Sequence, residues 1–387
     1  MFLKGQSYIH ILPFVGDTEN MQYLIASLLG IIGLTIKKSK VVFGVLFIFM
    51  WILFGWNTGN ADYFGYEQTY YSLESYNGFN VYFAEYEIGY RFVYKLAHAF
   101  GMNYNTFLIV YSLIGLMLIS NTILKYSAKP SYVMALYLIY PFLMDIVQIR
   151  NFMSMAIIIF AARYLFSSRK GDLFRYVLFV LLAASFQVVG LFYLILLLAK
   201  VRARIKLVKW ISLITIFLVL FLILLMSGIA IPILGGMAYL GTKTSITTQI
   251  GYLFYFIIGF LLVRFSYKKV RTLEDSSSSG KHVVDYSKMN MANIILNINI
   301  IILCVYPLVF FSTEFMRLYR NILLLNYILF SHIVVSGFAS RLNMTVFKIT
   351  TIIFVVLSEW LFAYYASKDI VFYPIFEKNK IFDLLGL

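Results

Sequence analysis

The chain has 387 residues, of which 61% are apolar and only 13% are charged, and its formal net charge is +15. So low a charged fraction excludes an ordinary water-soluble domain, and apolar runs near the roughly 20 residues that cross a bilayer recur throughout. The sequence therefore predicts one all-α, polytopic transmembrane helical bundle that spans residues 1–387.

Apolar segments indicate about twelve membrane spans. They lie at about 21–36, 41–56, 104–124, 131–146, 151–167, 174–186, 188–200, 210–228, 249–264, 289–311, 319–338 and 345–366. Several are shorter than a full span, so flanking residues or a thinned bilayer must complete them.

Basic residues predict the orientation of these spans. When the loop around Lys38 is placed in the cytoplasm and the following loops alternate, 22 of the 32 basic residues fall inside and most acids fall outside. Cytoplasmic loops of membrane proteins collect Lys and Arg in this way. Both termini are therefore expected outside. The net charge reflects orientation, and no nucleic-acid partner is expected.

Three connecting segments are distinctive. Residues 57–103 form a predicted extracytoplasmic loop, and within it residues 87–100 place charged and apolar side chains on separate faces of an amphipathic helix at the membrane surface. Residues 227–249 form a second outer loop. Residues 264–288 contain four consecutive serines and are expected to be a flexible cytoplasmic loop.

The first outer loop is rich in tyrosine and acid. From Trp56 to Arg91 it holds eight tyrosines and five acids, among them Tyr63, Tyr66, Tyr90, Asp62 and Glu87. A tyrosine ring offers a flat apolar face to a sugar, and carboxylates accept hydrogen bonds from its hydroxyls. The stretch indicates a carbohydrate site, and the alternative is an interfacial aromatic belt.

Two arginine-bearing stretches are candidates for binding an anion. In the first, Asp145, Gln148 and Asn151 share one face if the helix continues, and Arg150 stands at the outer membrane surface. A guanidinium there needs a carboxylate or phosphate partner. The alternative is a structural ion pair with Asp145 or with an acid of the tyrosine-rich loop.

The second stretch repeats Glu314, Arg317 and Arg320 at three-residue steps, with Asn321 alongside. It offers another phosphate site, or else snorkelling anchors at the membrane surface. Arg91 is the remaining arginine of this group on the outer side.

Several polar residues lie within or beside the predicted spans. Glu359 within the last span is either functional or a protonated structural residue. Three asparagines of the tenth span, Asn290, Asn293 and Asn297, suggest hydrogen bonds between helices. The four histidines have no metal-ligand spacing, and neither a metal nor another cofactor is expected.

Short motifs of the chain resemble those of the EpsG-like branch of Wzy-type polysaccharide polymerases. The residues concerned are Asp62 with Tyr66, the run Glu87-x-Gly89-Tyr90, and Ile149-Arg150-Asn151 at an outward turn. Two positions depart from the family pattern, since Asn151 stands where Gln is common and Gln187 stands where His is common.

The resemblance implies a GT-C-like architecture in a bacterial inner or plasma membrane. It implies a polymerase that transfers a growing glycan from undecaprenyl diphosphate to a lipid-linked repeat unit on the outer face, for capsule, exopolysaccharide or O-antigen. Membrane lipid, a flippase and a chain-length regulator are the implied partners.

Within that mechanism, Arg150, Arg317 and Arg320 are expected to bind the diphosphate. Asp62 or Glu87 would be the general base, with Tyr63, Tyr66 and Tyr90 as a sugar platform. Substrate contacts are also expected from Arg91, Gln148, Asn151 and Gln187. A lipid-linked oligosaccharide flippase, or an outer-face ligase that uses a lipid-phosphate donor, remains the alternative.

Overall fold

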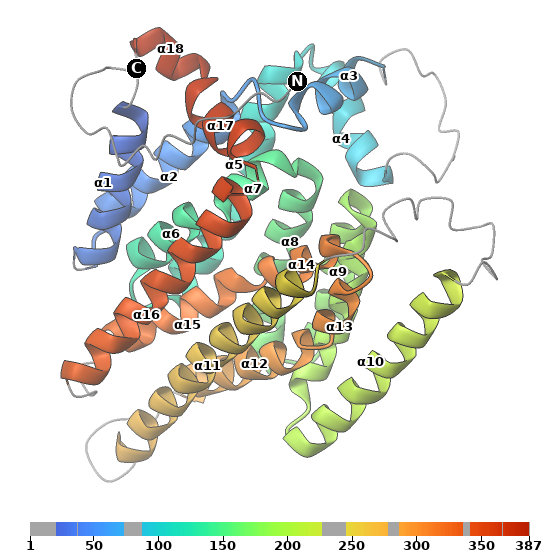
Figure 1. Ribbon diagram of the computed structural model, residues 1–387, viewed down its shortest axis with the longest axis vertical. Coiled ribbons are helices and arrows are strands. Elements are labelled where there is room, and N and C mark those ends of the chain that lie inside the picture. The colour runs from blue at the N-terminus through green and yellow to red at the C-terminus, as the bar shows by residue number, and fades with distance from the viewer. Residues whose placement is uncertain are drawn as a thin grey trace, which may run out of the picture.

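The computed structural model describes residues 21–36, 38–72, 87–226, 245–277, 286–335, 341–365 and 367–386 (Figure 1). Over these residues the chain is helical, and the one β-type contact is an isolated bridge between Asn57 and Asn379. The second outer loop predicted at 227–249 lies almost wholly outside the described residues.

The elements follow in chain order. They are α1 (Met21–Thr35), α2 (Lys40–Gly55), α3 (Tyr63–Ser72), α4 (Ile88–Ala99), α5 (Tyr104–Tyr126), α6 (Pro130–Ile139), α7 (Phe142–Val147), α8 (Ile149–Phe166), α9 (Asp172–Phe186), η3 (Val188–Lys200), α10 (Arg204–Met226), α11 (Ile246–Ser277), α12 (Tyr286–Ile302), α13 (Val305–Val309), η6 (Thr313–Phe315), α14 (Met316–Arg320), α15 (Leu323–Val335), α16 (Arg341–Glu359), η7 (Trp360–Tyr365), η8 (Lys368–Phe372), α17 (Tyr373–Glu377) and α18 (Lys380–Leu385).

Over the described residues, each predicted apolar segment is mainly helical, but fewer than twelve of the helices are long enough to cross a membrane. Among the described residues, seven helices are long and apolar enough to cross a membrane: Tyr104–Tyr126, Ile149–Phe166, Arg204–Leu224, Ile246–Thr272, Ser287–Val309, Thr313–Val335 and Leu342–Tyr365. Four shorter apolar helices accompany them, at Met21–Thr35, Lys40–Gly55, Pro130–Ile139 and Val188–Lys200. The protein is therefore a multi-helix membrane protein, and the count of twelve spans is not confirmed.

Breaks in the helices account for part of this difference. The segment predicted at 131–146 ends as α6 at Ile139 and resumes as α7 at Phe142, because Pro141 between them has no backbone N–H to donate. The segment at 188–200 is a 3₁₀ helix, a tighter form that seldom runs so long.

The linker predicted at 264–288 is also shorter than expected. Helix α11 continues to Ser277, and α12 begins at Tyr286. The extension buries Ser266 and Val270 on one face, so packing overrides the polar composition over its first turns. Residues 278–285 lie outside the described residues.

The loops richest in cations meet at one end of the bundle. There, Lys129 before α6 donates to the Leu34 carbonyl oxygen of α1 at 2.8 Å, and Asn290 of α12 donates to the Phe166 carbonyl oxygen of α8. We call this the basic end, which includes the starts of α6, α9, α10 and α12. The opposite end carries α3, α4 and the start of α8, and we call it the tyrosine end (Figure 1).

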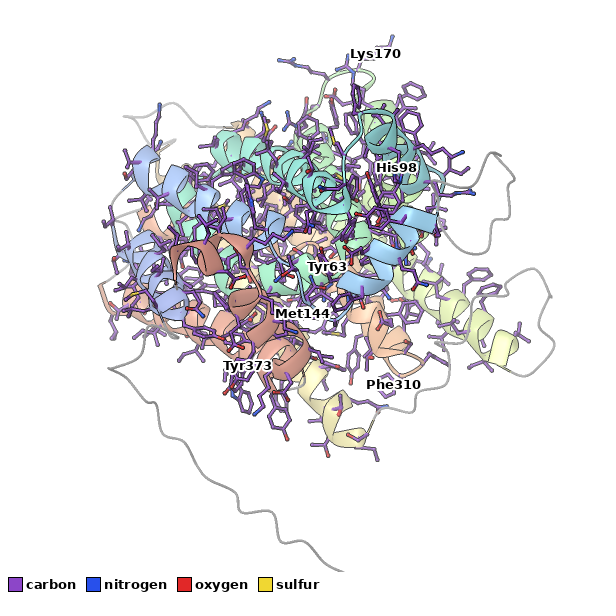
Figure 2. The ribbon with its side chains drawn as sticks, turned by 90° about the horizontal axis from the view of Figure 1, so that it is seen from above. Tyr63, His98, Met144, Lys170, Phe310 and Tyr373 are labelled. Atoms are coloured by element: carbon purple, nitrogen blue, oxygen red, sulfur yellow. The ribbon has the colours of Figure 1, made fainter. Side chains whose placement is uncertain are left out.

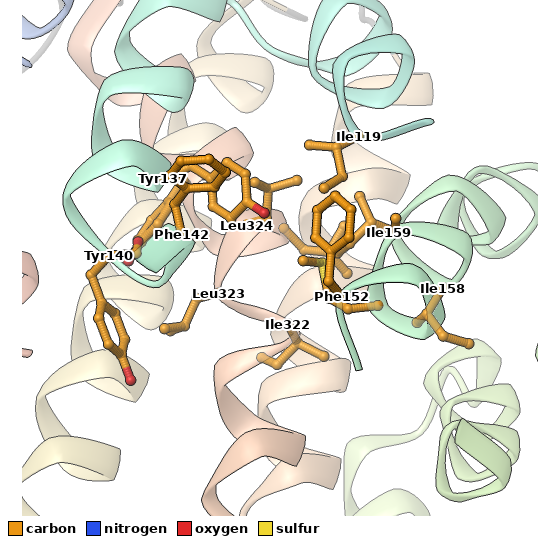
Figure 3. Packing of buried hydrophobic residues seen from close by; sticks show 14 of the residues in the cluster. Ile119, Tyr137, Tyr140, Phe142, Phe152, Ile158, Ile159, Ile322, Leu323 and Leu324 are labelled. Carbon is orange, nitrogen blue, oxygen red and sulfur yellow. The ribbon is translucent and has the colours of Figure 1, made fainter. Parts of the chain in front are cut away.

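Between the two ends the bundle is closely packed and apolar. Figure 3 shows Phe152 and Ile159 of α8, Ile119 of α5 and Leu324 of α15 in this core, and each is at most 2% exposed. A Cβ at Gly115 of α5 would overlap the Phe152 ring, so the glycine lets α5 and α8 approach.

The asparagines of α12 make the predicted hydrogen bonds between segments. Asn297 donates to the Ala199 carbonyl oxygen at 2.8 Å, and Asn293 accepts from Arg204 at 2.9 Å. These contacts join α12 to η3 and α10, which confirms the interpretation of this polar stripe.

Helix α4 is the amphipathic helix expected over 87–100. Its apolar stripe points away from the protein, since Ile88, Phe92, Leu96 and Phe100 are between 45% and 70% exposed. The opposite face buries Tyr90. Such an apolar stripe suits a helix that lies at a membrane surface.

The C-terminal helices are fastened beside the tyrosine end. Buried Asn57 donates to the Pro374 carbonyl oxygen at 2.9 Å, and buried Asn379 donates to the Ile52 carbonyl oxygen at 3.0 Å. Together with the isolated bridge, these bonds hold α17 and α18 against the end of α2 and so fix the approach to α3.

Replacing Asn379 by alanine should loosen this attachment. The Asn379→Ala change leaves the Ile52 carbonyl without its side-chain donor and removes the cap on Ile381 N, at a cost of about 1–3 kcal/mol. Thermal unfolding of the purified protein in detergent, followed by tryptophan fluorescence, measures the effect. The matched control is Lys380→Ala, because that side chain is exposed. Equal melting temperatures for the two variants would contradict the attachment.

Candidate functional site

The carboxylate of Glu87 joins three parts of the chain at the tyrosine end. Its Oε2 accepts a hydrogen bond from Nη1 of Arg150 at 2.8 Å, and its Oε1 accepts one from the backbone N–H of Val188 at 3.1 Å. Glu87 precedes α4, Arg150 is in the first turn of α8, and Val188 begins η3. The side chains of Arg150 and Glu87 are 25% and 16% exposed, so the ion pair is partly desolvated yet reachable from outside.

Gly89 lets α4 come close enough for this contact. Helix α4 packs on α9, and a Cβ at position 89 would lie only 2.8 Å from the Ser185 carbonyl oxygen. Glycine is therefore required where the backbones approach. The run Glu87-x-Gly89-Tyr90 combines the carboxylate, the close approach and a buried ring.

Two tyrosine rings flank the guanidinium of Arg150. Its Cζ lies 5.9 Å from the ring centroids of both Tyr66 and Tyr90, within the range of cation–π attraction. Burial raises the pKa of the Tyr66 hydroxyl, and the neighbouring Arg150 opposes that rise. Arg150 is thus held by one carboxylate and two aromatic faces.

The three tyrosines expected to form a platform differ in exposure, although the rings of Tyr66 and Tyr90 meet edge to face with their centroids 6.0 Å apart. Tyr90 is 0% exposed, and its hydroxyl meets that of Tyr94. Tyr63 is 4% exposed and donates to Asn105 Oδ1 at 2.9 Å. Those two rings support the site from within, which leaves the half-buried Tyr66 as the ring best placed to meet a sugar.

Asp62 lies beside this cluster at the start of α3, within electrostatic range of Arg150 and Arg317. Its side chain is exposed, and its carboxylate makes no hydrogen bond or ion pair with the described part of the chain. Desolvation by the surrounding protein raises the pKa of the Asp62 carboxyl, and the two arginines oppose the rise. Figure 2 looks onto this end, with Tyr63 of α3 and Met144 of α7 near the centre of the view.

The polar face expected over 145–151 is interrupted. Helix α7 ends at Val147 and α8 begins at Ile149, so Gln148 stands at a break. Asp145 is completely buried and accepts from the Tyr137 hydroxyl at 2.9 Å, so it is not the partner of Arg150. The sequence pattern assumed a continuous helix, and Asp145 instead supports the interior.

Gln148 and Asn151 both face α14 and the residues that follow it. Gln148 Oε1 accepts from Arg320, which is only 7% exposed. Asn151 and Asn321 exchange two amide hydrogen bonds of 3.1 and 2.9 Å. These contacts hold the start of α8 against the second arginine stretch and so position Arg150.

The remaining predicted residues lie around this junction. Arg317 pairs with Glu314, and its side chain is 20% exposed, so it lies nearer the surface than Arg320. Arg91 is half-buried one turn along α4 from Glu87. Gln187 ends α9 directly before Val188, whose amide Glu87 binds.

Several supporting groups were not identified from the sequence. They are the Val188 amide, the close contact at Ser185 and the Tyr94 hydroxyl. Each depends on how the folded chain is packed, and local sequence patterns do not reveal such contacts. The spacing of Tyr90, Tyr94 and Ala97 along α4 does carry a signal, because it marks the helix face that is buried.

Glu359 lies apart from this cluster. Both carboxylate oxygens of Glu359 are buried without a hydrogen-bond partner among the described residues, beside a small cavity that Tyr23 and Phe376 also line. Among the described residues, no group of three or more His, Cys, Asp or Glu side chains is placed to hold a metal ion.

No curated protein and no solved structure matches the chain. Residues 40–375, which are most of the chain and include the whole junction around Glu87 and Arg150, match the EpsG family. Membership of this family indicates polysaccharide biosynthesis at a membrane and, in general terms, a polysaccharide polymerase. The chain belongs to the EpsG family.

Proposed function

We propose that the protein polymerises lipid-linked oligosaccharide repeat units. A hydroxyl of the incoming unit attacks the anomeric carbon of the growing glycan, the bond to undecaprenyl diphosphate breaks, and the lipid diphosphate leaves with the bonding electrons. The hydroxyl proton passes to a carboxylate. The observation that carries this proposal is the partly exposed Arg150–Glu87 pair beside Tyr66 and Asp62, a carboxylate without a hydrogen bond or ion pair among the described residues.

Arg150 suits the leaving group of this reaction. Negative charge grows on the diphosphate as the bond breaks, and a forked guanidinium in a partly desolvated site stabilises that charge better in the transition state than in the ground state. Because Glu87, Tyr66 and Tyr90 hold Arg150 before substrate arrives, little reorganisation is needed. Arg317, nearer the surface, provides a second cation for the same group.

The two candidate carboxylates take different roles in this proposal. Glu87 is already engaged by Arg150 and by the Val188 amide, so it positions the arginine. Asp62 has no such partner among the described residues, its side chain is exposed, and the pKa of its carboxyl is raised, which are properties of a group that can accept a proton. Gln187 and Tyr66 are placed to bind substrate hydroxyls.

The buried members of the cluster act as supports in this account. Arg320, Gln148 and Asn151 are committed to contacts between α8 and the α14–α15 connection. In this proposal they fix the position of Arg150, and Arg317 is the one that contacts the diphosphate. Arg91 remains a proposed substrate contact on α4.

The setting of the reaction also belongs to the proposal. The positive-inside pattern places the tyrosine end on the outer face of a bacterial inner or plasma membrane. The product would be capsule, exopolysaccharide or O-antigen, the architecture GT-C-like, and a flippase and a chain-length regulator would be partners. A flippase function is less well supported, because the interior between the two ends is mostly apolar, and its buried Asn299 and Asn326 bond to each other.

Exchanging Arg150 for lysine tests the leaving-group role. The Arg150→Lys variant keeps the charge but loses the fork, so polymerisation should slow by about 10²–10³-fold. The assay uses purified protein and a synthetic lipid diphosphate-linked repeat unit, with products separated on a ladder gel. Arg163→Lys is the matched control, since Arg163 lies near the other end of α8. An unchanged ladder with Arg150→Lys would argue against the role.

Removing the carboxylate of Asp62 tests the base. The Asp62→Asn variant should lose about 10²–10⁴-fold in rate. An ordinary aspartate has a pKa of about 3.9. Because the pKa of Asp62 is raised in the wild type, its carboxylate gains a proton at a higher pH than that. The rate should therefore fall, as the pH is lowered, with a midpoint above that value, and the residual rate of Asp62→Asn should lack this step.

The control for this measurement is Asp383→Asn, an exposed acid on α18. It should keep the wild-type rate and pH profile. If Asp62→Asn retains both as well, Asp62 is not the base.

A further inference from the structure

A second charged site lies at the basic end, away from Arg150. A cavity of about 550 Å³ opens between α10, α11 and α12. Four cations line it: Arg204, Arg264, Lys268 and Arg271. No acidic side chain is among the described residues that line it. The cavity shares none of its lining residues with the tyrosine end.

The cations converge from two helices. Arg264, Lys268 and Arg271 are four and three residues apart, so they share one face of α11. Arg204 approaches from the start of α10, where it donates to Asn293 Oδ1 at 2.9 Å and stacks over the Tyr267 ring at 4.5 Å. These two contacts orient the guanidinium toward the cavity before any ligand is bound.

The cavity changes from charged to apolar along the bundle. Helix α11 runs toward the basic end, so Phe260 lies deeper than its cations, by about 16 Å relative to Arg271 at 1.5 Å per residue. Helix α12 runs away from that end, and its Leu296 and Ile300 line the same deeper wall. The cavity is thus lined by cations at the basic end and by apolar side chains toward the middle of the bundle.

The helices beside the cavity face the lipid region. Helix α10 packs mainly on α12 and α13 and stands at the edge of the bundle (Figure 1). Its Trp210, Leu213 and Phe217 are 51% to 67% exposed. Membrane lipid therefore lies directly beside a helix that forms one wall of the cavity.

We propose that this cavity binds the phosphate headgroup of a membrane lipid, with the lipid chains along Phe260, Leu296 and Ile300. The four cations match an anionic headgroup, and a basic recess between membrane helices is a recognised form of such a site. A soluble anion would use the charged part only. The inference does not rest on the polymerase proposal, because it concerns other residues at the other end of the bundle.

The test measures lipid binding to the purified full-length protein in detergent. Phosphatidylglycerol, cardiolipin, undecaprenyl phosphate, phosphatidylcholine and inorganic pyrophosphate are titrated separately, and bound species are counted by native mass spectrometry. The site variant is Arg264→Gln with Lys268→Gln. The matched control is Lys206→Gln with Lys269→Gln, which removes two positive charges from α10 and α11 at positions that do not line the cavity.

The site variant should weaken binding of at least one anionic lipid about 30-fold, and the control variant by less than about twofold. The anionic lipid that loses most identifies the source of the headgroup. Equal losses in both variants would overturn the proposal. So would phosphatidylcholine or pyrophosphate binding the cavity as tightly as the anionic lipids.

A second measurement stands if the site variant does not fold. A photoreactive phenylalanine analogue at position 260 should cross-link to the anionic lipid in the otherwise unchanged protein. If no anionic lipid is cross-linked, the lipid chains do not lie along Phe260, and the proposal is overturned.

Discussion

The structure of the tyrosine end depends on the charge pair of Arg150 and Glu87. A guanidinium at the mouth of an apolar bundle is costly unless a carboxylate and polarisable rings compensate it. Here Glu87 supplies the charge, and Tyr66 and Tyr90 supply the rings. Since Glu87 also binds the Val188 amide, the same carboxylate fixes the approach of α4, α8 and η3. The local fold and the proposed chemistry therefore depend on one contact.

The polar groups of the chain are divided between the two ends of the bundle. Carboxylates, phenols and arginines mix at the tyrosine end, whereas the cavity at the basic end is lined by cations without a described acid. The middle is apolar and tightly packed (Figure 3). A mixed site can both bind a diphosphate and accept a proton, while a purely cationic one can only bind an anion. This difference is the physical reason for proposing catalysis at one end and lipid binding at the other.

Hydropathy and spacing predicted much of this arrangement. Over the described residues the predicted apolar segments are mainly helical, because a backbone surrounded by lipid must satisfy its own hydrogen bonds. Asn290, Asn293 and Asn297 form hydrogen bonds to other segments, as their spacing suggested. For a structural ion pair of Arg150, the sequence left two candidates, Asp145 or an acid of the tyrosine-rich loop. The structure shows that the partner is Glu87, which belongs to that loop. The break at Gln148 escaped prediction, because nothing in that residue itself ends a helix.

Other features depend on contacts between distant parts of the chain. The bond from Asn57 to Pro374 joins residues more than 300 positions apart, and no local pattern signals it. Tyr90 was expected at a sugar surface, yet α4 turns it inward because its apolar stripe occupies the exposed face. The extent of α11 was underestimated because burial of Val270 outweighs a polar composition. In each case tertiary packing decided what propensity left open.

The most direct test of the central claim is a double-mutant cycle between Glu87 and Arg150. Polymerisation rates are measured for Glu87→Gln, Arg150→Lys and the double variant in the same purified system. If the carboxylate acts by holding the arginine, the two losses overlap, and the double variant should be little slower than the worse single variant. Losses that multiply in full would contradict the account, because the two residues would then act independently.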